Sequence, residues 1–197
     1  MPLLQMPNEL LLQVMKDLWD SQDVKALQAA ACTCKVLREI SEVYLYSTAK
    51  FIHGSILNTF LDAGTRVAKR RSYLRSLKLL YSAMGRHDPS DILHYSLDLD
   101  LTSFPNLESL ALECFVRYHG TTIEDLCGSF NDQYMRAFTQ ASLLSESLET
   151  PRPFQKLRSL TLIWISSETK TWDIEPTSPV FLLPQLQSLE ISYVDIS

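Results

Sequence analysis

One six-residue phrase, Leu-x-Ser-Leu-x-Leu/Ile, occurs four times along this chain of 197 residues. The copies span 74–79, 107–112, 157–162 and 186–191, so their starts lie 33, 50 and 29 residues apart. Towards the end of each phrase apolar residues alternate with polar or small ones, which is typical of a strand with one buried face. A unit that recurs at such intervals predicts a repeat architecture, with strands stacked in parallel and a return connection in each interval.

The recurring unit is longer than the phrase, because three copies share a lead-in at 104–106, 154–156 and 183–185. The sequence resembles irregular leucine-rich repeats, whose regular unit has about 20 to 29 residues. The widest interval carries an insertion with two helical patterns, at 122–126 and 133–138. The chain ends six residues after the fourth phrase without a polar capping repeat, which predicts a repeat region incomplete at its C-terminal end.

Residues 4–48 have the pattern of a compact helical block. Pro7 and Glu9 suit the first turn of a helix. An apolar stripe follows at Leu11, Val14, Met15 and Leu18. A polar stretch at 19–23 supplies capping residues for a second helix with stripe residues Val24, Leu27 and Ala31, and Thr33 is placed to cap a third with Val36, Leu37 and Ile40. Three short helices bury little surface alone, so we expect the block to have a partner.

The run from Met6 to Ile40 resembles an F-box, the motif that docks substrate receptors onto the Skp-type adaptor of cullin–RING ubiquitin ligases. Met6 stands where the family usually has Leu, Leu37 where many members have Trp or Phe, and residues 32–35 replace a Val-Cys-Arg-like stretch. Residues 43–46 resemble the extension common after fungal F-boxes. The resemblance implies adaptor contacts by Met6, Pro7, Leu10, Leu11, Val14, Leu18, Leu27 and Leu37.

The sequence thus predicts an α+β or α/β solenoid in three parts: an F-box-like domain at 4–48, a helical linker at 49–73 and a leucine-rich-repeat-like region at 74–197. The resemblance implies a substrate-recognition subunit of an SCF-type E3 ubiquitin ligase, which binds an unknown protein client through the outward residues of the sheet. The candidate client contacts are Tyr81, Glu113, Trp164 and Tyr193. The alternative is a repeat scaffold whose N-terminal helices only cap the solenoid. An exposed stripe of Leu11, Val14 and Leu18 favours docking, and a buried stripe favours the cap.

The residue types argue against an independent hydrolase or transferase. None of the phrase serines lies in Gly-x-Ser-x-Gly, the five glycines form no phosphate-binding loop, and the four histidines lack metal-ligand spacing. We expect no catalytic residue, metal or cofactor. The few, unevenly placed cysteines favour a reducing compartment, and no apolar run approaches the ~20 residues of a membrane span. The expected location is cytoplasmic or nuclear, without a membrane partner.

Two features of the charge pattern bear on possible partners: the net charge and one basic run. The net charge of −5 argues against a nucleic-acid partner, because phosphate contacts come mainly from Lys and Arg. A basic run occupies 66–78 and comprises Arg66, Lys69, Arg70, Arg71, Arg75 and Lys78. Apolar residues at helical spacing lie among these charges, which favours a solvated helix face, with nuclear targeting as the alternative.

Overall fold

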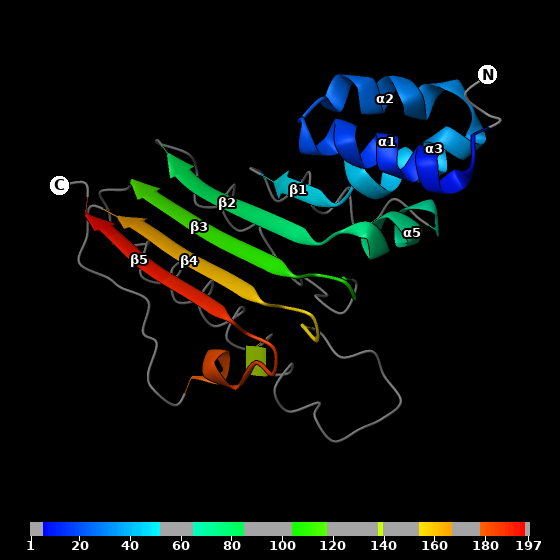
Figure 1. Ribbon diagram of the computed structural model, residues 1–197. Helices are drawn as coiled ribbons and strands as arrows, with labels where there is room; N and C mark the ends of the chain where they lie inside the picture. The colour runs from blue at the N-terminus through cyan, green and yellow to red at the C-terminus, as the bar shows by residue number, and fades with distance from the viewer. Residues whose placement is uncertain are drawn as a thin grey trace.

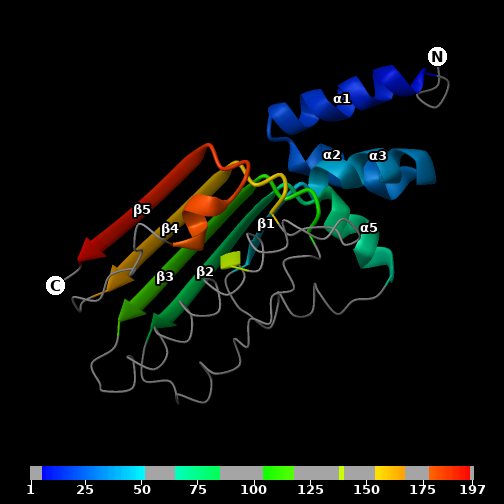
Figure 2. The same cartoon turned by 90° about the horizontal axis from the view of Figure 1, so that it is seen from below.

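The computed structural model describes residues 6–51, 65–84, 104–117, 138–139, 154–166 and 178–195. It describes side chains within 6–51, 69–80, 104–113, 138–139, 154–163, 178 and 180–192. A block of helices precedes a parallel sheet of five strands, which agrees with the expected α+β or α/β class (Figure 1). Figures 1 and 2 place the block beyond the amino ends of the strands, on the β1 side of the sheet.

Three helices form the block: α1 (Asn8–Asp20), α2 (Val24–Thr33) and α3 (Lys35–Leu45). The Asp23 carboxylate caps α2 by accepting a hydrogen bond from the Ala26 amide at 3.0 Å, as the polar stretch predicted. Thr33 does not cap α3. It ends α2, where its hydroxyl donates to the carbonyl of Ala30 at 2.7 Å, and Cys34 precedes α3 without a side-chain cap.

The block has a core of its own, drawn from all three helices. Leu11 and Met15 lie one turn apart on α1 and pack against Leu27 of α2 and Leu37 of α3. Each of the four is at most 4% exposed. The fully buried hydroxyl of Ser41 donates to the Met15 sulfur at 3.4 Å, so the buried polar side chain in this core has a partner. The α1 stripe is thus divided: Leu11 and Met15 pack inside the block, Leu18 is half-buried and Val14 is 36% exposed. It is neither the exposed stripe expected for docking nor a stripe buried against the sheet, as expected for a cap.

Within the described residues the sheet contains five strands, all parallel and arranged in chain order. They are β1 (Thr48–Phe51), β2 (Ser76–Met84), β3 (Ser109–Arg117), β4 (Ser159–Ser166) and β5 (Ser188–Asp195). Each copy of the phrase supplies one strand, and the serines of the four phrases are direct register partners. The strand prediction and the parallel arrangement are confirmed, although the intervals differ in length.

The stretch 49–73 is not a helical linker throughout. Helix α5 (Thr65–Tyr73) lies in it, but Thr48–Phe51 form β1, which pairs with β2 in the register Thr48 to Ser76. Its backbone joins the sheet as the later strands do: the amides of Arg75 and Ser76 both donate to the carbonyl of Ser47, at 2.8 and 2.9 Å. This strand lacks the leucine phrase, so the repeat pattern gave no sign of it.

Leucines of the phrase fill the inner face of the sheet. Three of them, Leu77, Leu110 and Leu160, are completely buried, and the next row holds Leu79, Leu112 and Leu162 at 7%, 0% and 0% exposure. The lead-in residues Phe104, Phe154 and Leu183 are also buried. The inner face is less well buried at the last strand, because Ile191 on β5 is 44% exposed.

The insertion after β3 contributes to this core at one described point. Phe138 is fully buried, and its ring lies 5.4 Å from that of Phe154, centre to centre. The pair Phe138–Thr139 is helical, at the end of the predicted helix 133–138. The rest of that helix and the predicted helix 122–126 lie outside the described residues. Among the helices that the structure describes, none has the length and apolar content to cross a membrane.

Candidate interaction surfaces

The eight predicted adaptor contacts fall into three groups. Those that form the block's own core are Leu11, Leu27 and Leu37. Those that are partly buried and pack against this core are Met6 and Leu18. Those exposed to solvent are Pro7, Leu10 and Val14. A buried side chain has little surface to offer a partner, so only the last group presents a direct contact surface in this structure.

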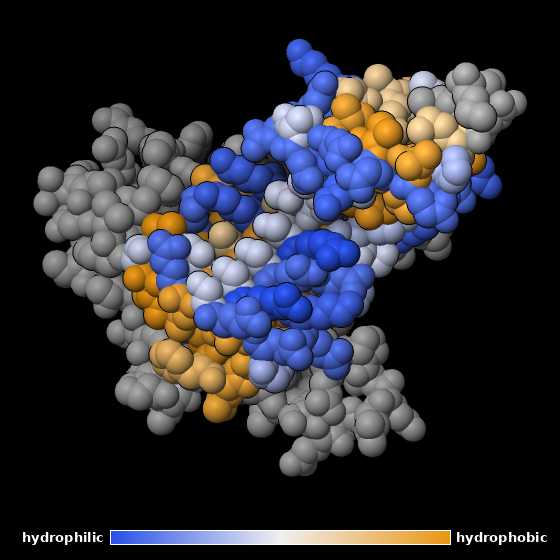
Figure 3. All heavy atoms as spheres, viewed as in Figure 1, coloured by the Kyte–Doolittle hydropathy of each residue, from blue (hydrophilic) through white to orange (hydrophobic). Residues whose placement is uncertain are grey.

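Leu10 and Val14 form the clearest apolar patch of the block, named here the Leu10/Val14 patch. They are 50% and 36% exposed and lie one turn apart on α1, so their side chains share one side of the helix. Figure 3 shows apolar residues gathered over the block on the face turned to the viewer. Solvated leucine and valine at this spacing lose no core packing when a partner covers them, and burying them is favourable.

Three further exposed apolar residues belong to the block: Leu12, Val24 and Val36, at 44%, 41% and 45%. The sequence pattern assigned Val24 and Val36 to buried stripes. Both stand in the first turn of their helix, where the neighbouring helices do not cover them. Leu12 lies off the α1 stripe and was not predicted to have a role.

Tyr44 joins α3 to α1. Its hydroxyl donates to the carbonyl of Leu12 at 3.4 Å. Burial raises the pKa of the Tyr44 phenol, and the carboxylates of Asp20 and Asp17 add to this rise, because each disfavours a second negative charge nearby. This hydrogen bond between α3 and α1 forms only while the phenol keeps its proton.

Arg70 joins the block to the helix that leads into the sheet. Its guanidinium, on α5, donates to the Glu42 carboxylate of α3 at 2.7 Å and lies 4.6 Å from the ring centre of Tyr46. The hydrogen bond to Glu42 is the main reason why the pKa of Arg70 is raised. A charge-assisted hydrogen bond together with a cation–π contact favours one orientation of α5 against α3.

Two further charges of the basic run also form ion pairs inside the molecule. Arg75 pairs with Glu108 at 2.8 Å, and Lys78 pairs with Glu113, so each of these cations is matched by a carboxylate of β3 or of the turn before it. Since Arg70 is paired as well, three of the six cations have acidic partners among the described residues. This arrangement favours a structural role for the run over a free basic patch.

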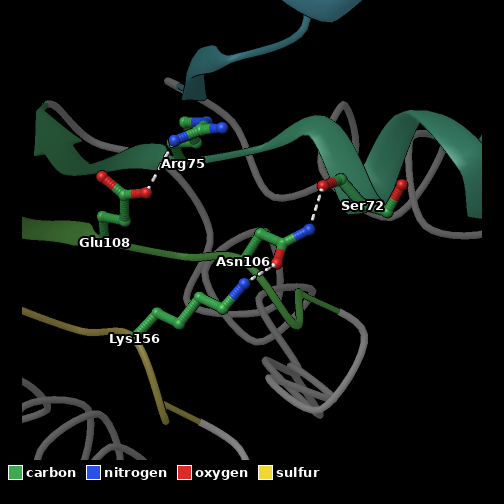
Figure 4. A network of polar contacts seen from close by, with 5 residues as sticks. All are labelled: Ser72, Arg75, Asn106, Glu108 and Lys156. Carbon is green, nitrogen blue, oxygen red and sulfur yellow. Dashed lines mark hydrogen bonds and ion pairs between the residues drawn. The ribbon is translucent and has the colours of Figure 1, made fainter.

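A second network links successive repeat units at the amino ends of the strands (Figure 4). The Asn106 amide donates to the carbonyl of Ser72 at 2.6 Å, and its oxygen accepts from the Lys156 ammonium at 2.6 Å. Asn106 lies in the lead-in of the second phrase and Lys156 in that of the third. The lead-ins therefore connect one unit to the next through side chains as well as through backbone.

The outer face of the sheet consists of rows of register partners. Its first row carries hydroxyls: Thr48, Ser76, Ser109, Ser159 and Ser188. The next row, named here the charged row, holds Lys50, Lys78, Ala111, Thr161 and Glu190. Every residue of both rows is half-buried or exposed, whereas the leucines between them are buried on β2, β3 and β4.

The four predicted client contacts do not form one column. Glu113 follows the charged row on the outer face, beside Leu80 and Ile163, and pairs with Lys78. Tyr81, Trp164 and Tyr193 share a different row of register partners, one position further along each strand. The side chains of these three aromatic residues lie outside the described part of the chain. The described outer face is therefore polar, with Leu80 and Ile163 as half-buried apolar members.

Within the residues that the structure describes, no group of three or more His, Cys, Asp or Glu side chains is placed to hold a metal ion. In comparisons with known proteins, no family model, no curated protein and no solved structure matches this chain. Two surfaces of the described residues are therefore candidates for a functional contact: the Leu10/Val14 patch of the helical block and the outer face of the sheet.

Proposed function

We propose that this protein is a substrate-recognition subunit of a cullin–RING E3 ubiquitin ligase. In this proposal the helical block is an F-box that docks on a Skp-type adaptor, the sheet belongs to an irregular leucine-rich-repeat solenoid, and the outer face of that sheet binds a protein client. The protein contributes proximity. Holding a client lysine near a ubiquitin thioester replaces a bimolecular encounter, so the receptor needs no catalytic side chain.

The observation that carries the proposal is the separation of the block's core from its exposed apolar residues. Leu11, Met15, Leu27 and Leu37 pack among themselves, so the block does not use its apolar stripe to cover the end of the sheet. Leu10 and Val14 meanwhile remain exposed beside this core. A helical cap is expected to bury its apolar side against the first repeat, and a docking module is expected to keep a folded core and an apolar surface for its partner.

The link between the block and the sheet supports the same function. A receptor works by proximity only when the adaptor-binding part and the client-binding part keep a fixed relation. Arg70, held by Glu42 and stacked over Tyr46, joins α3 to the helix that enters β2. We propose that this contact sets the direction in which the sheet presents the client.

The test is capture of this chain by a purified Skp-type adaptor, using a double variant of the patch, Leu10→Lys with Val14→Lys. Both residues are exposed, so the variant is expected to fold, while two charges placed in an apolar contact should weaken capture at least about tenfold, since burying an unpaired charge costs several kcal/mol. The matched control is Gln28→Lys, which adds a lysine at an exposed position of α2 outside the patch.

Circular dichroism must show the same helix content in all three proteins. Capture by the wild type and the control, and loss in the double variant, supports the docking role. If the wild type is folded but the adaptor does not capture it, the docking role is contradicted. The alternative then remains, a repeat scaffold whose N-terminal helices only cap the solenoid. Leu11 is unsuitable for this test because it is 1% exposed, so changing it would unfold the block and remove binding for an unrelated reason.

A further inference from the structure

The charged row carries opposite charges at its two ends. Lys50 on β1 and Glu190 on β5 are both exposed, and within the described residues neither has an ion-pair partner. The second lysine of the row, Lys78, is neutralised by Glu113. From the described residues Glu190 accepts only a long hydrogen bond, 3.4 Å, from the Thr161 hydroxyl. Among the described residues, the row thus ends in one unmatched cation and one unmatched anion.

The position of Lys50 is unfavourable in the absence of a partner. It lies beside Lys78 in the register of β1 and β2, and like charges directly opposite each other on neighbouring strands are destabilising. Glu113 pairs with Lys78 and so reduces the repulsion between the two lysines, but Lys50 has no anion of its own among the described residues. A carboxylate supplied by another molecule would relieve this repulsion.

The middle of the row is suited to an extended chain. Ala111 is the central residue and has the smallest side chain of the row. The hydroxyl row lies on one side of it, and the half-buried Leu80 and Ile163 lie in the row on the other side. Hydroxyls can bond to a peptide backbone, and the two apolar residues can contact a side chain between its charged ends.

The register fixes the separation of the two charges. Lys50 and Glu190 stand on the first and fifth strands of one row, and neighbouring strands lie about 4.8 Å apart, so the row spans about 19 Å. An extended chain advances about 3.3 Å per residue, so this span corresponds to about six residues. A polyanion such as a nucleic acid does not fit, because the exposed carboxylate of Glu190 at one end of the row would repel it.

We infer that the outer face binds an extended protein segment that runs across the strands, with an acidic side chain over Lys50 and a basic side chain about six residues away over Glu190. The inference rests on the proposed function only in taking this face as the client-binding face. It names the charge pattern that a client segment must carry. The segment can run in either direction, because only the distance between the two charges is fixed.

The test is selection from a phage-displayed library of random nonapeptides on the purified full chain. The wild type is expected to enrich peptides with one acidic and one basic residue about six positions apart. Lys50→Glu makes both ends of the row negative, so this variant is expected to enrich peptides with two basic residues at that spacing. Glu190→Lys makes both ends positive, so it is expected to enrich peptides with two acidic residues at that spacing. The matched control is Lys25→Glu, a charge reversal at an exposed lysine of α2, which should select the same peptides as the wild type.

A synthetic peptide from the wild-type selection provides the affinity measurement by fluorescence anisotropy. Reversing Lys50 should weaken its binding by at least about fivefold, because an exposed ion pair contributes up to ~1 kcal/mol and is replaced by repulsion. Two results would overturn the inference. One is that the Lys50→Glu and Glu190→Lys variants enrich the same peptides as each other, and the other is that the peptides enriched by the wild type show no preferred spacing between an acidic and a basic residue.

These outcomes are separate from adaptor capture. If the chain selects peptides with spaced charges but is not captured by the adaptor, the binding face is supported and the ligase role is contradicted. A chain that is captured but selects no spaced charges keeps the ligase role and loses the charged row as the client contact.

Discussion

The inner row formed by Leu79, Leu112, Leu162 and Ile191 allows one comparison of burial at matched positions. Leu162 on β4 has a strand on each side and is completely buried, so Leu162→Ala should leave a cavity and cost about 3 kcal/mol. Ile191 on β5 is at the edge and 44% exposed, and complete burial of such a side chain is worth about 2 to 3 kcal/mol, so Ile191→Ala should cost only about 1 kcal/mol.

Urea denaturation followed by circular dichroism measures both costs. With a denaturant dependence near 2 kcal/mol/M, the unfolding midpoint should fall by about 1.5 M for Leu162→Ala and about 0.5 M for Ile191→Ala, with an unchanged slope. Equal losses would show that the last row is covered as well as the inner rows, for example by self-association in solution. In that case the reasoning from an uncovered fifth strand is wrong, and the concentration dependence of the midpoint would identify association as the cause.

Three further results are expected. In a double-mutant cycle, Arg70→Gln and Glu42→Gln should show a coupling free energy of about 1 kcal/mol in urea denaturation, and zero coupling would remove their proposed role in fixing α5 against α3. Because burial raises the pKa of Tyr44, its protonated phenol should contribute to the free energy of unfolding below pH ~10, and this contribution should be lost as pH rises through the folded-state pKa. Tyr44→Phe should reduce the loss, measured as the difference between the free energies of unfolding at about pH 8 and pH 10.5. Asn106→Asp keeps an acceptor for Lys156 but loses the donor to the Ser72 carbonyl, and should cost about 1 kcal/mol by the same assay, whereas an unchanged midpoint would mean that this bond contributes nothing.

The sequence predicted the strands well because their signal is local. The phrase places leucines at alternate positions, and alternation reports directly on which side of a strand is buried, so the pattern alone indicates that Leu77, Leu110 and Leu160 belong to the core. Strand β1 was missed for the same reason. Thr48–Phe51 owe their place to the neighbouring β2, and no leucine phrase marks them.

The candidate surfaces were less predictable, because exposure depends on contacts between distant segments. Helical spacing placed Leu11 and Val14 on one stripe, yet Leu11 faces the other two helices while Val14 lies at the edge of that contact. The partners of the basic run were also hidden, since Glu42, Glu108 and Glu113 come from three different segments. The charged row became visible only when the register placed Lys50 and Glu190 in line.

Register and connection length are independent in this sheet. The partners Thr48, Ser76, Ser109, Ser159 and Ser188 are separated by 28, 33, 50 and 29 residues, and all stand in one row. A connection can therefore gain or lose many residues without moving any position of the outer face. Gaining or losing a whole unit, by contrast, changes the separation of Lys50 and Glu190 by one strand spacing, about 4.8 Å. In evolutionary terms, such a sheet would alter the length of segment it recognises in discrete steps, and its connections would be free to diverge in sequence.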